Sequence, residues 1–236
     1  MKKSEFLSMK EDQNSSSLLD ILMNTGKIKI KEAASEDDII MAGRMRYDIY
    51  IEKQGKRYTD ANNELKLLID DLDSQSCILF GYYNENIVAT LRVSSGTNKN
   101  VLDHFNKYFN ASKAVNVFGG DSVYFLSRLV SNLSPLTGKV TYRLFEYVYA
   151  SLRMKGGRVV ILHTVPSLVN YFKAIGFQQA WGEFVCSAAG VQIPMIMAFD
   201  NVERLCKIKS PLRRIASQFS HCEEAQKCID REFIIF

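Results

Sequence analysis

The fold is decided by the stretch Val169-Asn170-Tyr171-Phe172-Lys173-Ala174-Ile175-Gly176-Phe177. Pro166 begins a helix just upstream, and Gly176 ends it, because glycine readily adopts the left-handed conformation that closes many helices. Phe177 then opens a strand. The stretch predicts a helix packed beside the strand that follows it, and the remaining elements are assigned outward from there.

Hydrophobic patterns on both sides of this stretch predict an alternation of strands and helices. Alternating Lys and Ile residues mark the first strand, and Asn84-Glu85-Asn86 joins two apolar runs into a hairpin. The predicted strands are Lys27–Lys31, Cys77–Tyr83, Ile87–Ser94, Ser122–Val130, Arg158–His163, Gln178–Ser187 and Ile193–Phe199. The predicted helices are Ser15–Asn24, Ser35–Ile51, Val101–Phe109, Lys139–Lys155, Pro166–Ile175 and a tail after Asn201 that is broken at Pro211.

Because this order mixes hairpins with helical crossovers, the sheet is predicted to be mixed rather than fully parallel. The expected fold is α+β, an α/β/α sandwich with a mixed central sheet of about seven strands, flanking helices and a helical C-terminal tail. We expect a flexible segment and short helix at residues 1–26, the main domain at residues 27–200 and a helical extension at residues 201–236.

The composition argues against a nucleic-acid-binding protein, a disulfide-rich protein and a membrane-spanning protein. The chain has 236 residues and a net charge of +4, which is far from the strongly basic signature of nucleic-acid-binding proteins. Its five cysteines form no CxxC pair, so neither a metal site nor a disulfide framework is expected. The sequence has no 18-residue apolar run, and its polar beginning lacks a signal-peptide core. We expect a cytoplasmic protein with no membrane span and no nucleic-acid partner.

A cationic residue interrupts the apolar strand Ser122–Val130. Arg128 lies within Tyr-Phe-Leu-Ser-Arg-Leu-Val, and an unpaired buried charge costs several kcal/mol, roughly 3 to 5. The candidate partners are Asp70, Asp71 and Asp73. The sequence therefore predicts an ion pair between this strand and the Asp70–Asp73 segment.

The element order and the Tyr171-to-Phe177 helix ending resemble the GNAT fold of acyltransferases. In that family, loop amides at a helix N-terminus hold the donor's pyrophosphate, which the free N–H groups and the helix dipole favour. The corresponding segment here is Ser134-Pro135-Leu136-Thr137-Gly138-Lys139, which keeps one of the usual spaced glycines. The resemblance implies donor contacts at Thr137, Gly138 and Lys139, with Lys139 supplying a positive charge.

A second set of residues is similar to one branch of that family, the acyl-homoserine-lactone synthases and the N-acyl amino acid synthases. Its members share an Arg and an aromatic residue on the first helix, a second aromatic residue, two aspartates at i and i+3, and two further arginines. The matching residues are Arg46, Tyr50, Tyr58, Asp70, Asp73, Arg92 and Arg128. This resemblance spans about residues 27 to 200.

The resemblance also implies roles for individual residues. Arg128, Asp70, Asp73 and Tyr171 are the expected catalytic residues, with Tyr171 placed to protonate the leaving thiolate. The expected substrate-binding residues are Arg46, Tyr50, Tyr58, Arg92, Ser127, Leu129 and Val130. Within this set, a backbone N–H near Leu129 or Val130 would polarise the thioester carbonyl.

Two departures favour the amino-acid-acylating relatives. The lactone synthases carry a Glu three residues before the strand Arg, where this chain has Phe125, and their Trp is replaced by Tyr58. The general base stays open between Asp70 or Asp73 acting through water and His163. The apolar residues Phe80, Phe125, Leu144, Val148, Ile161, Phe184 and Met195 either line an acyl tunnel or fill the core.

The leading hypothesis is an N-acyltransferase that moves a medium or long acyl group onto the amine of an amino acid or similar small molecule. Acyl carrier protein or acyl-CoA would serve as co-substrate, with no permanently bound cofactor. One alternative is a GNAT enzyme that uses acetyl-CoA. Another is a non-catalytic fold that binds an acyl chain or a partner.

Overall fold

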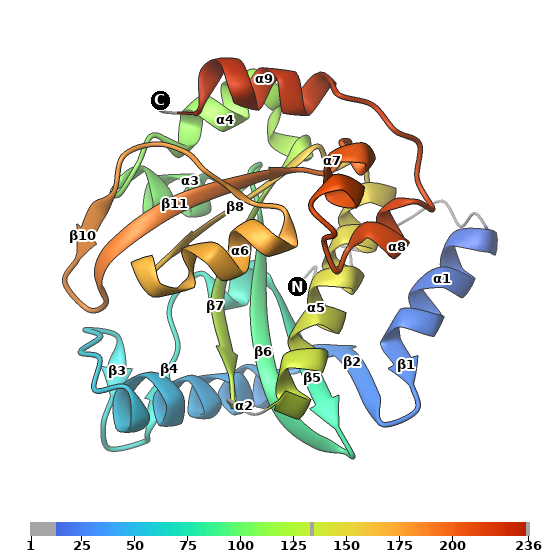
Figure 1. Cartoon of the computed structure of the whole chain (residues 1–236). Coiled ribbons are helices and arrows are strands. Elements are labelled where there is room, and N and C mark those ends of the chain that lie inside the picture. The colour runs from blue at the N-terminus through green and yellow to red at the C-terminus, as the bar shows by residue number, and fades with distance from the viewer. Residues whose placement is uncertain (1–12, 133–134, 235–236) are drawn as a thin grey trace.

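A computed structural model describes residues 13–132 and 135–234 of the chain, and of residues 13–16 and 135–137 it describes the backbone alone. A nine-stranded mixed sheet crosses the described part of the molecule (Figure 1). Its strands are β1 (Asn24–Thr25), β2 (Ile28–Glu32), β5 (Cys77–Tyr83), β6 (Asn86–Ser95), β7 (Val123–Ser131), β8 (Val159–Thr164), β9 (Gln178–Gln179), β10 (Phe184–Cys186) and β11 (Gly190–Ala198). β3 (Ala61–Asn62) and β4 (Leu67–Leu68) form a separate two-stranded ribbon.

The strands follow the order β1-β2-β5-β6-β7-β8-β11-β10, with β9 also paired to β11. All these pairs are antiparallel except β7 with β8. This parallel pairing covers Val123 to Phe125 opposite Val159 to Ile161, after which the two strands are no longer paired. The predicted mixed α+β sandwich is confirmed.

Helices cover both faces of the sheet (Figure 1). One face carries α1 (Gln13–Met23), α5 (Pro135–Met154), α6 (Val169–Ile175), α7 (Val202–Lys207) and α8 (Arg213–Ala216). The opposite face carries α2 (Glu36–Arg46), α3 (Lys99–Asn106), α4 (Ala111–Phe118) and α9 (Glu224–Glu232). In the described part of the chain, no helix combines the length and hydropathy needed to cross a bilayer.

Alternation along each strand separates the two faces. On β6, Leu91 and Val93 pack toward α5, while Arg92 and Ser94 point to the opposite face. On β8, Leu162 packs with the α5 core and Ile161 with the α3–α4 core. This division decides which side chains reach each side of the gap between β7 and β8.

The first helix changes its winding near the site. Ser35 is the N-cap of α2, and its hydroxyl accepts the Asp38 N–H in a capping box. The helix continues as a π-helix, η2, over Tyr47–Lys53. Single π-turns are rare and often mark functional positions. This turn carries Tyr50.

Three predicted boundaries were wrong. The segment after β7 was predicted as a loop up to Gly138, but α5 begins at Pro135, where proline's fixed φ suits the first helical turn. The predicted strand Gln178–Ser187 breaks into β9 and β10 around Trp181, which has a φ of 59°. The predicted helix Val101–Phe109 ends at Asn106, and Asn110 caps a second helix, α4.

Gly176 joins α6 to the strand that follows, as the deciding stretch predicted. Its φ is 141°, and an added Cβ would lie 2.6 Å from Leu205 Cδ2 and 2.9 Å from Met197 Sδ. No other residue type fits there without strain and displacement of both neighbours.

The Gly176→Ala variant is therefore expected to lower the free energy of unfolding by about 1 to 3 kcal/mol. Urea denaturation followed by circular dichroism measures the change. Gly182→Ala is the matched control, because an added Cβ there has nothing within 4 Å. Equal stability of the two variants would contradict this account of the α6 ending.

Candidate active site

A cavity of about 500 Å³ lies where β7 and β8 separate. Its lining comes from both faces of the sheet. From the α5 face come the apolar residues Leu91, Leu126, Phe145, Leu162 and Phe172. From the opposite side come mainly polar and aromatic residues, among them Tyr50, Lys56, Tyr58, Arg92, His104, Tyr108, Ser127, Arg128, His163, Phe184 and Gln192. The cavity thus passes through the sheet, apolar at one end and polar at the other.

A bulge in β7 gives the cavity its polar wall. The register between β6 and β7 shifts between Thr90 and Arg92, and Arg128 takes a φ of 54°. A non-glycine residue in this left-handed region costs about 1 to 3 kcal/mol and persists only where its surroundings hold it. The bulge turns the Arg128 side chain toward the Asp70 segment.

Side chains from η2 and the loop after it hold this bulge in place. The Tyr50 hydroxyl donates to the Leu129 carbonyl oxygen over 2.7 Å. The Tyr58 ring lies under the Arg128 guanidinium, 4.8 Å from its Cζ, and 5.6 Å from the Tyr50 ring. Cation–π and aromatic contacts of this kind add to the ion pairs described next.

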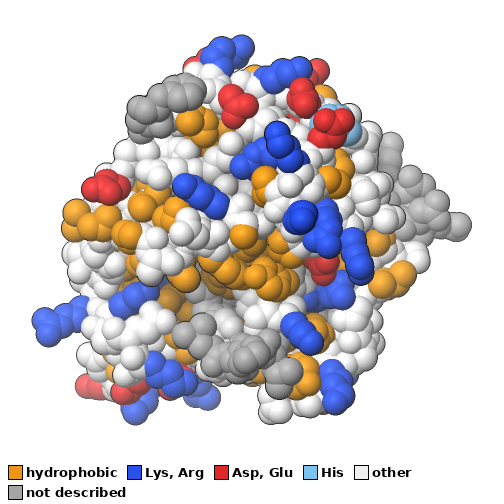
Figure 2. Space-filling view, in the orientation of Figure 1, with side chains coloured by type: hydrophobic (Ala, Val, Ile, Leu, Met, Phe, Trp, Pro, Cys, Tyr) orange, Lys and Arg blue, Asp and Glu red, His pale blue; other side chains and the backbone are white. Residues whose placement is uncertain are grey.

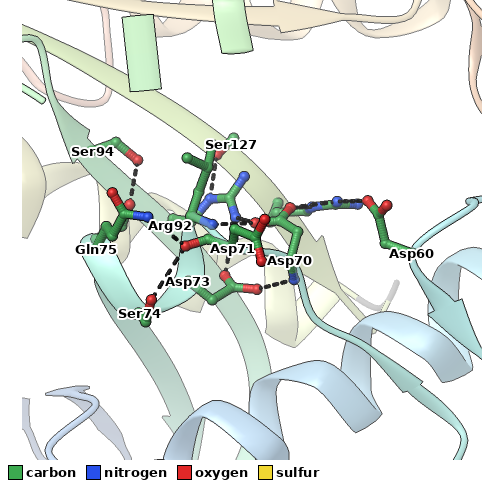
Figure 3. Close-up of polar contacts among 12 residues, drawn as sticks. Asp60, Asp70, Asp71, Asp73, Ser74, Gln75, Arg92, Ser94 and Ser127 are labelled. Carbon is green, nitrogen blue, oxygen red and sulfur yellow. Dashed lines mark hydrogen bonds and ion pairs between the residues drawn. The ribbon is translucent and has the colours of Figure 1, made fainter. Parts of the chain in front are cut away.

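Three arginines converge on two aspartates behind the bulge. Figure 3 shows Asp70 and Asp73 pointing toward Arg92, with Ser127 on its other side. Arg128 donates to one Asp70 oxygen over 2.6 Å from Nη2, and Arg92 pairs with the other. Arg46 Nη1 donates to Asp73 Oδ1 over 2.8 Å, and Arg92 Nη1 reaches the same oxygen over 3.1 Å.

The i, i+3 spacing of the two aspartates has a local cause. Asp70 Oδ1 accepts the Leu72 N–H over 3.0 Å, and Asp73 Oδ2 accepts the Asp70 N–H over 2.9 Å. Each carboxylate therefore stabilises the turn with one oxygen and binds arginine with one or both. The hydrogen bonds of the turn thus hold both carboxylates in the positions from which they bind the arginines.

The cluster carries more positive than negative buried charge. Arg46, Arg92 and Asp73 are almost fully buried, and Arg128 and Asp70 expose 11% and 12% of their side chains. A third carboxylate, Asp60, lies 3.5 Å from Arg128 but is 47% exposed. Within the described residues, Nε and Nη2 of Arg46 are buried without a hydrogen-bond partner.

The pKa shifts follow from this arrangement. Burial alone would raise the pKa of Asp70, but Arg92 and Arg128 outweigh it and hold that pKa well below its ordinary value. Burial lowers the pKa of Arg46, opposed by Asp73. Asp70 therefore stays ionised at neutral pH.

The structure brings together most of the sequence-predicted site residues. Those that line the cavity are Tyr50, Tyr58, Arg92, Ser127, Arg128 and Leu129. Arg46, Asp70 and Asp73 lie behind this wall and hold it through the arginines. Val130 is buried beside Leu129 and does not line the cavity.

Of the remaining predicted residues, Tyr171, Gly138 and Lys139 lie outside this lining. Tyr171 stacks on Tyr142 of α5, with ring centroids 5.8 Å apart, and burial raises its pKa. Thr137 and Gly138 lie in the first turn of α5, and Lys139 follows that turn and is exposed. Ser134 and the side chain of Thr137 lie outside the described part of the chain. Neither Tyr171 nor Lys139 contacts the arginine cluster.

Several cavity residues were not predicted. Lys56 lies between the two predicted tyrosines in sequence, and its ammonium is 4.4 Å from the Tyr50 ring centre. His104 and Tyr108 are four residues apart, a spacing that places two side chains on one face of the predicted helix. Burial lowers the pKa of His104 to about 4.

The apolar residues considered for an acyl tunnel mostly fill the core. Phe184 lines the cavity. The others, Phe80, Phe125, Leu144, Val148, Ile161 and Met195, are buried and absent from the lining. On α5 the cavity is lined instead by Phe145, one position along from the predicted Leu144.

One group of potential metal ligands occurs among the described residues. Glu203, His221 and Glu223 place one ligand atom each within 4.8 Å of one another. The group is largely exposed, and none of its members lines the cavity.

Comparison with solved structures places this geometry in a known fold. FeeM, an N-acyl amino acid synthase from uncultured soil microbes, superposes with a TM-score of 0.59 at 12% identity over 78% of this chain and 99% of its own. BjaI, a CoA-dependent acyl-homoserine lactone synthase with SAM and isopentyl-CoA, gives 0.57 at 14% identity over 84% and 99%. TofI, in a complex with an inhibitor and MTA, gives 0.58 at 15% identity over 78% and 97%.

No protein-family model and no curated protein sequence matches the chain. The similarity to solved structures, all at low sequence identity, establishes the fold. It confirms the resemblance in architecture to the synthase branch that the Arg and Asp positions indicated.

Asp73→Asn is expected to lower the free energy of unfolding by about 3 to 5 kcal/mol. The substitution removes the carboxylate charge that compensates the buried guanidinium groups of Arg46 and Arg92. Chemical denaturation of both proteins measures the loss. Asp71→Asn is the control, since Asp71 is exposed and accepts hydrogen bonds from Ser74 and Gln75 through its backbone carbonyl. A loss below 1 kcal/mol for Asp73→Asn would show that the cluster does not depend on this carboxylate.

Proposed function

We propose that the protein is an N-acyltransferase that moves a medium or long acyl group from a thioester to the amine of an amino acid or similar small molecule. The observation that carries this proposal is the cavity through the sheet, with an apolar end toward α5 and α6 and a cationic, aromatic end toward η2. A reaction between an apolar acyl donor and a polar acceptor needs such a site, because the two substrates meet from opposite sides.

The apolar end suits the acyl chain of the donor. Leu126 and Leu162 approach from the two diverging strands, and Phe145 and Phe172 close the cavity from the helices. The rings of Phe145 and Phe172 contact each other edge-to-face, with their centroids 6.1 Å apart. A chain lying here buries apolar surface worth about 25 cal/mol per Å². This lining favours a fatty-acyl donor over acetyl-CoA.

The donor's polar carrier would lie near the start of α5. Thr137 and Gly138 occupy the first turn, where backbone N–H groups and the helix dipole favour a phosphate, and Lys139 follows them. Figure 2 shows hydrophobic side chains gathered where α6 lies beside α5, with Lys and Arg side chains next to them over α7 and α8. The exposed residues Lys207, Lys209, Arg213 and Arg214 belong to that segment.

These cations favour an acidic carrier, either acyl carrier protein or the phosphates of CoA. The related BjaI structure holds isopentyl-CoA. In our proposal both donors remain candidates, and no permanently bound cofactor is needed.

The polar end suits an amine that also carries a negative group. Arg128 and Lys56 line this end, and the buried cluster behind it has an excess of positive charge. Phe125, at the position of the lactone synthases' Glu, stacks on Phe105 at 4.5 Å and offers no carboxylate. This departure supports an amino acid acceptor rather than a lactone-forming one.

The proposal gives three chemical roles to residues of the site. A backbone N–H at the bulge, from Leu129 or Val130, polarises the thioester carbonyl. The Arg128 and Asp70 pair, with Asp73 behind it, shapes the acceptor end of the cavity. Tyr171 protonates the departing thiolate, which requires its ring to turn from Tyr142 toward the cavity.

Intact-mass analysis of reactions with acyl carrier protein or CoA thioesters and a panel of amino acids tests the proposal. We expect N-acyl amino acids from donors of medium or long chain length. Product from acetyl-CoA alone would favour the acetyltransferase alternative. Binding of acyl donors without any product would favour the non-catalytic alternative.

Arg128→Gln is expected to lower kcat/KM by about 100-fold or more, because a neutral residue loses both the Asp70 pair and the cationic wall. Arg44→Gln is the matched control, since Arg44 is exposed on α2 and lies outside the cavity lining. Wild-type turnover by Arg128→Gln would contradict the assignment of this wall to the active site.

A further inference from the structure

His163 lies on the acceptor side of the gap between β7 and β8. It follows Leu162 by one position on β8, so its side chain lies on the opposite face from the acyl-chain lining. It lines the cavity, and its ring lies 5.4 Å from Phe184, 6.2 Å from Phe105 and 6.4 Å from Tyr108 between ring centres. The imidazole is therefore held among aromatic rings beside the point where donor and acceptor would meet.

Gln192 on β11 fixes the orientation of this imidazole. Its Oε1 lies 3.1 Å from His163 Nδ1. Its Nε2 donates to the backbone carbonyls of Ala189 and Val191, both over 3.0 Å. Because both carbonyls can only accept, the amide nitrogen must face them and the amide oxygen must face His163.

The orientation of the Gln192 amide also fixes the tautomer of His163. An amide oxygen only accepts hydrogen bonds, so Nδ1 must carry the proton that it receives. In the neutral imidazole the lone pair then belongs to Nε2. Among the residues that the structure describes, none hydrogen-bonds to Nε2.

We infer that Nε2 of His163 is the general base of the acyl transfer, and that Gln192 is the positioning residue that holds it in the required tautomer. This inference rests on the proposed N-acyltransferase function. It identifies the base that the sequence left open between His163 and the aspartates. Asp70 and Asp73 are instead bound to arginines, which lowers the basicity of Asp70.

The reaction balances around this base. The amine lone pair forms the C–N bond, the C–S bond breaks, and its electron pair leaves on the thiolate sulfur. The amine nitrogen gives one proton to His163 Nε2. The imidazolium then releases that proton to the thiolate, directly or through Tyr171, which yields the amide and a free thiol.

The surroundings keep the imidazole neutral before the reaction. Burial lowers the pKa of His163, the Gln192 hydrogen bond opposes this shift, and Arg128, Lys56 and Arg92 lower the pKa further. The other titratable groups of the described residues that line the cavity are Tyr50, Tyr58 and Asp60 from η2 and the loop after it, Tyr108 and His104 from the α3 side, and Cys186 from β10. A base must be unprotonated to act, so activity should fall as pH drops through a value below 6.5, the ordinary imidazole pKa.

His104 also lines the cavity but is less suited to this role. Its ring contacts Phe105 and Tyr108 edge-on at 5.2 Å and 5.6 Å, and no side chain among the described residues fixes its tautomer.

His163→Gln is expected to lower kcat by about 100-fold to 1,000-fold while acyl-donor binding stays near wild type. His221→Gln is the control, because His221 lies in the C-terminal segment and outside the cavity lining. Thermal unfolding of each variant shows whether a loss of activity reflects a loss of fold.

The Gln192→Glu variant tests whether Gln192 acts through His163, because the pH dependence of kcat/KM would not change if Gln192 only supported the fold. A carboxylate still accepts the Nδ1 proton but also stabilises the imidazolium, so the acid limb of kcat/KM should shift upward by about one pH unit or more. Nitrogen-15 NMR of histidine-labelled wild-type protein at pH 7 should show His163 protonated on Nδ1.

The outcomes separate the two proposals. If the wild-type protein makes no N-acyl product, the proposed function and this inference both fail. If it does, but His163→Gln keeps the wild-type rate or Gln192→Glu leaves the pH profile unchanged, the base assignment fails alone. An Nε2-protonated His163 in the NMR spectrum also overturns it, even if a variant fails to fold.

Discussion

The Asp70 carboxylate binds Arg92 with one oxygen and Arg128 with the other, and it thereby ties β6 to the bulge in β7. That bulge follows the end of the pairing between β7 and β8, which covers three positions and stops at Phe125. An Arg in left-handed conformation is unfavourable by about 1 to 3 kcal/mol. The ion pairs, the Tyr58 ring and the Tyr50 hydrogen bond offset that cost. The cavity through the sheet depends on this balance.

The main contribution of the arginine–aspartate cluster is to position the site residues, rather than to stabilise the fold. Replacing buried ion pairs by well-packed apolar groups is often neutral or stabilising, whereas removing one partner is costly. Here the two aspartates also accept hydrogen bonds from the amides of their own turn, which fixes the orientation of both carboxylates. The arrangement orients Arg128 toward the cavity and leaves an excess of positive charge behind the acceptor end.

The end of α6 and the arginine–aspartate cluster could largely be predicted from the sequence. Gly176 had to end a helix, and the charged Arg128 in an apolar strand required a carboxylate partner, which Asp70 supplies. Arg46, Asp73 and Arg92 were reached through their resemblance to one branch of a family, and the structure brings them together. These features depend on local conformation or on the high free-energy cost of a buried charge, and both can be predicted from the sequence.

Other features depend on which side chain fills which space, and the sequence did not reveal them. Phe145 rather than Leu144 lines the cavity, a shift of one position on α5 that only the packing decides. Lys56, Tyr108 and Gln192 approach from separate segments, and no spacing links them in sequence. The tautomer of His163 follows from the backbone carbonyls that Gln192 contacts, which are visible only in three dimensions.

The most direct test of the central claim is a crystal structure of the protein with an unreactive long-chain acyl-CoA thioether. The account predicts that the sulfur lies between β7 and β8 and that the acyl chain contacts Phe145, Leu162 and Phe172. The acceptor end, toward Arg128 and His163, should then remain open to a small amine. An acyl chain bound elsewhere on the molecule, or no ordered ligand at saturating concentration, would contradict it.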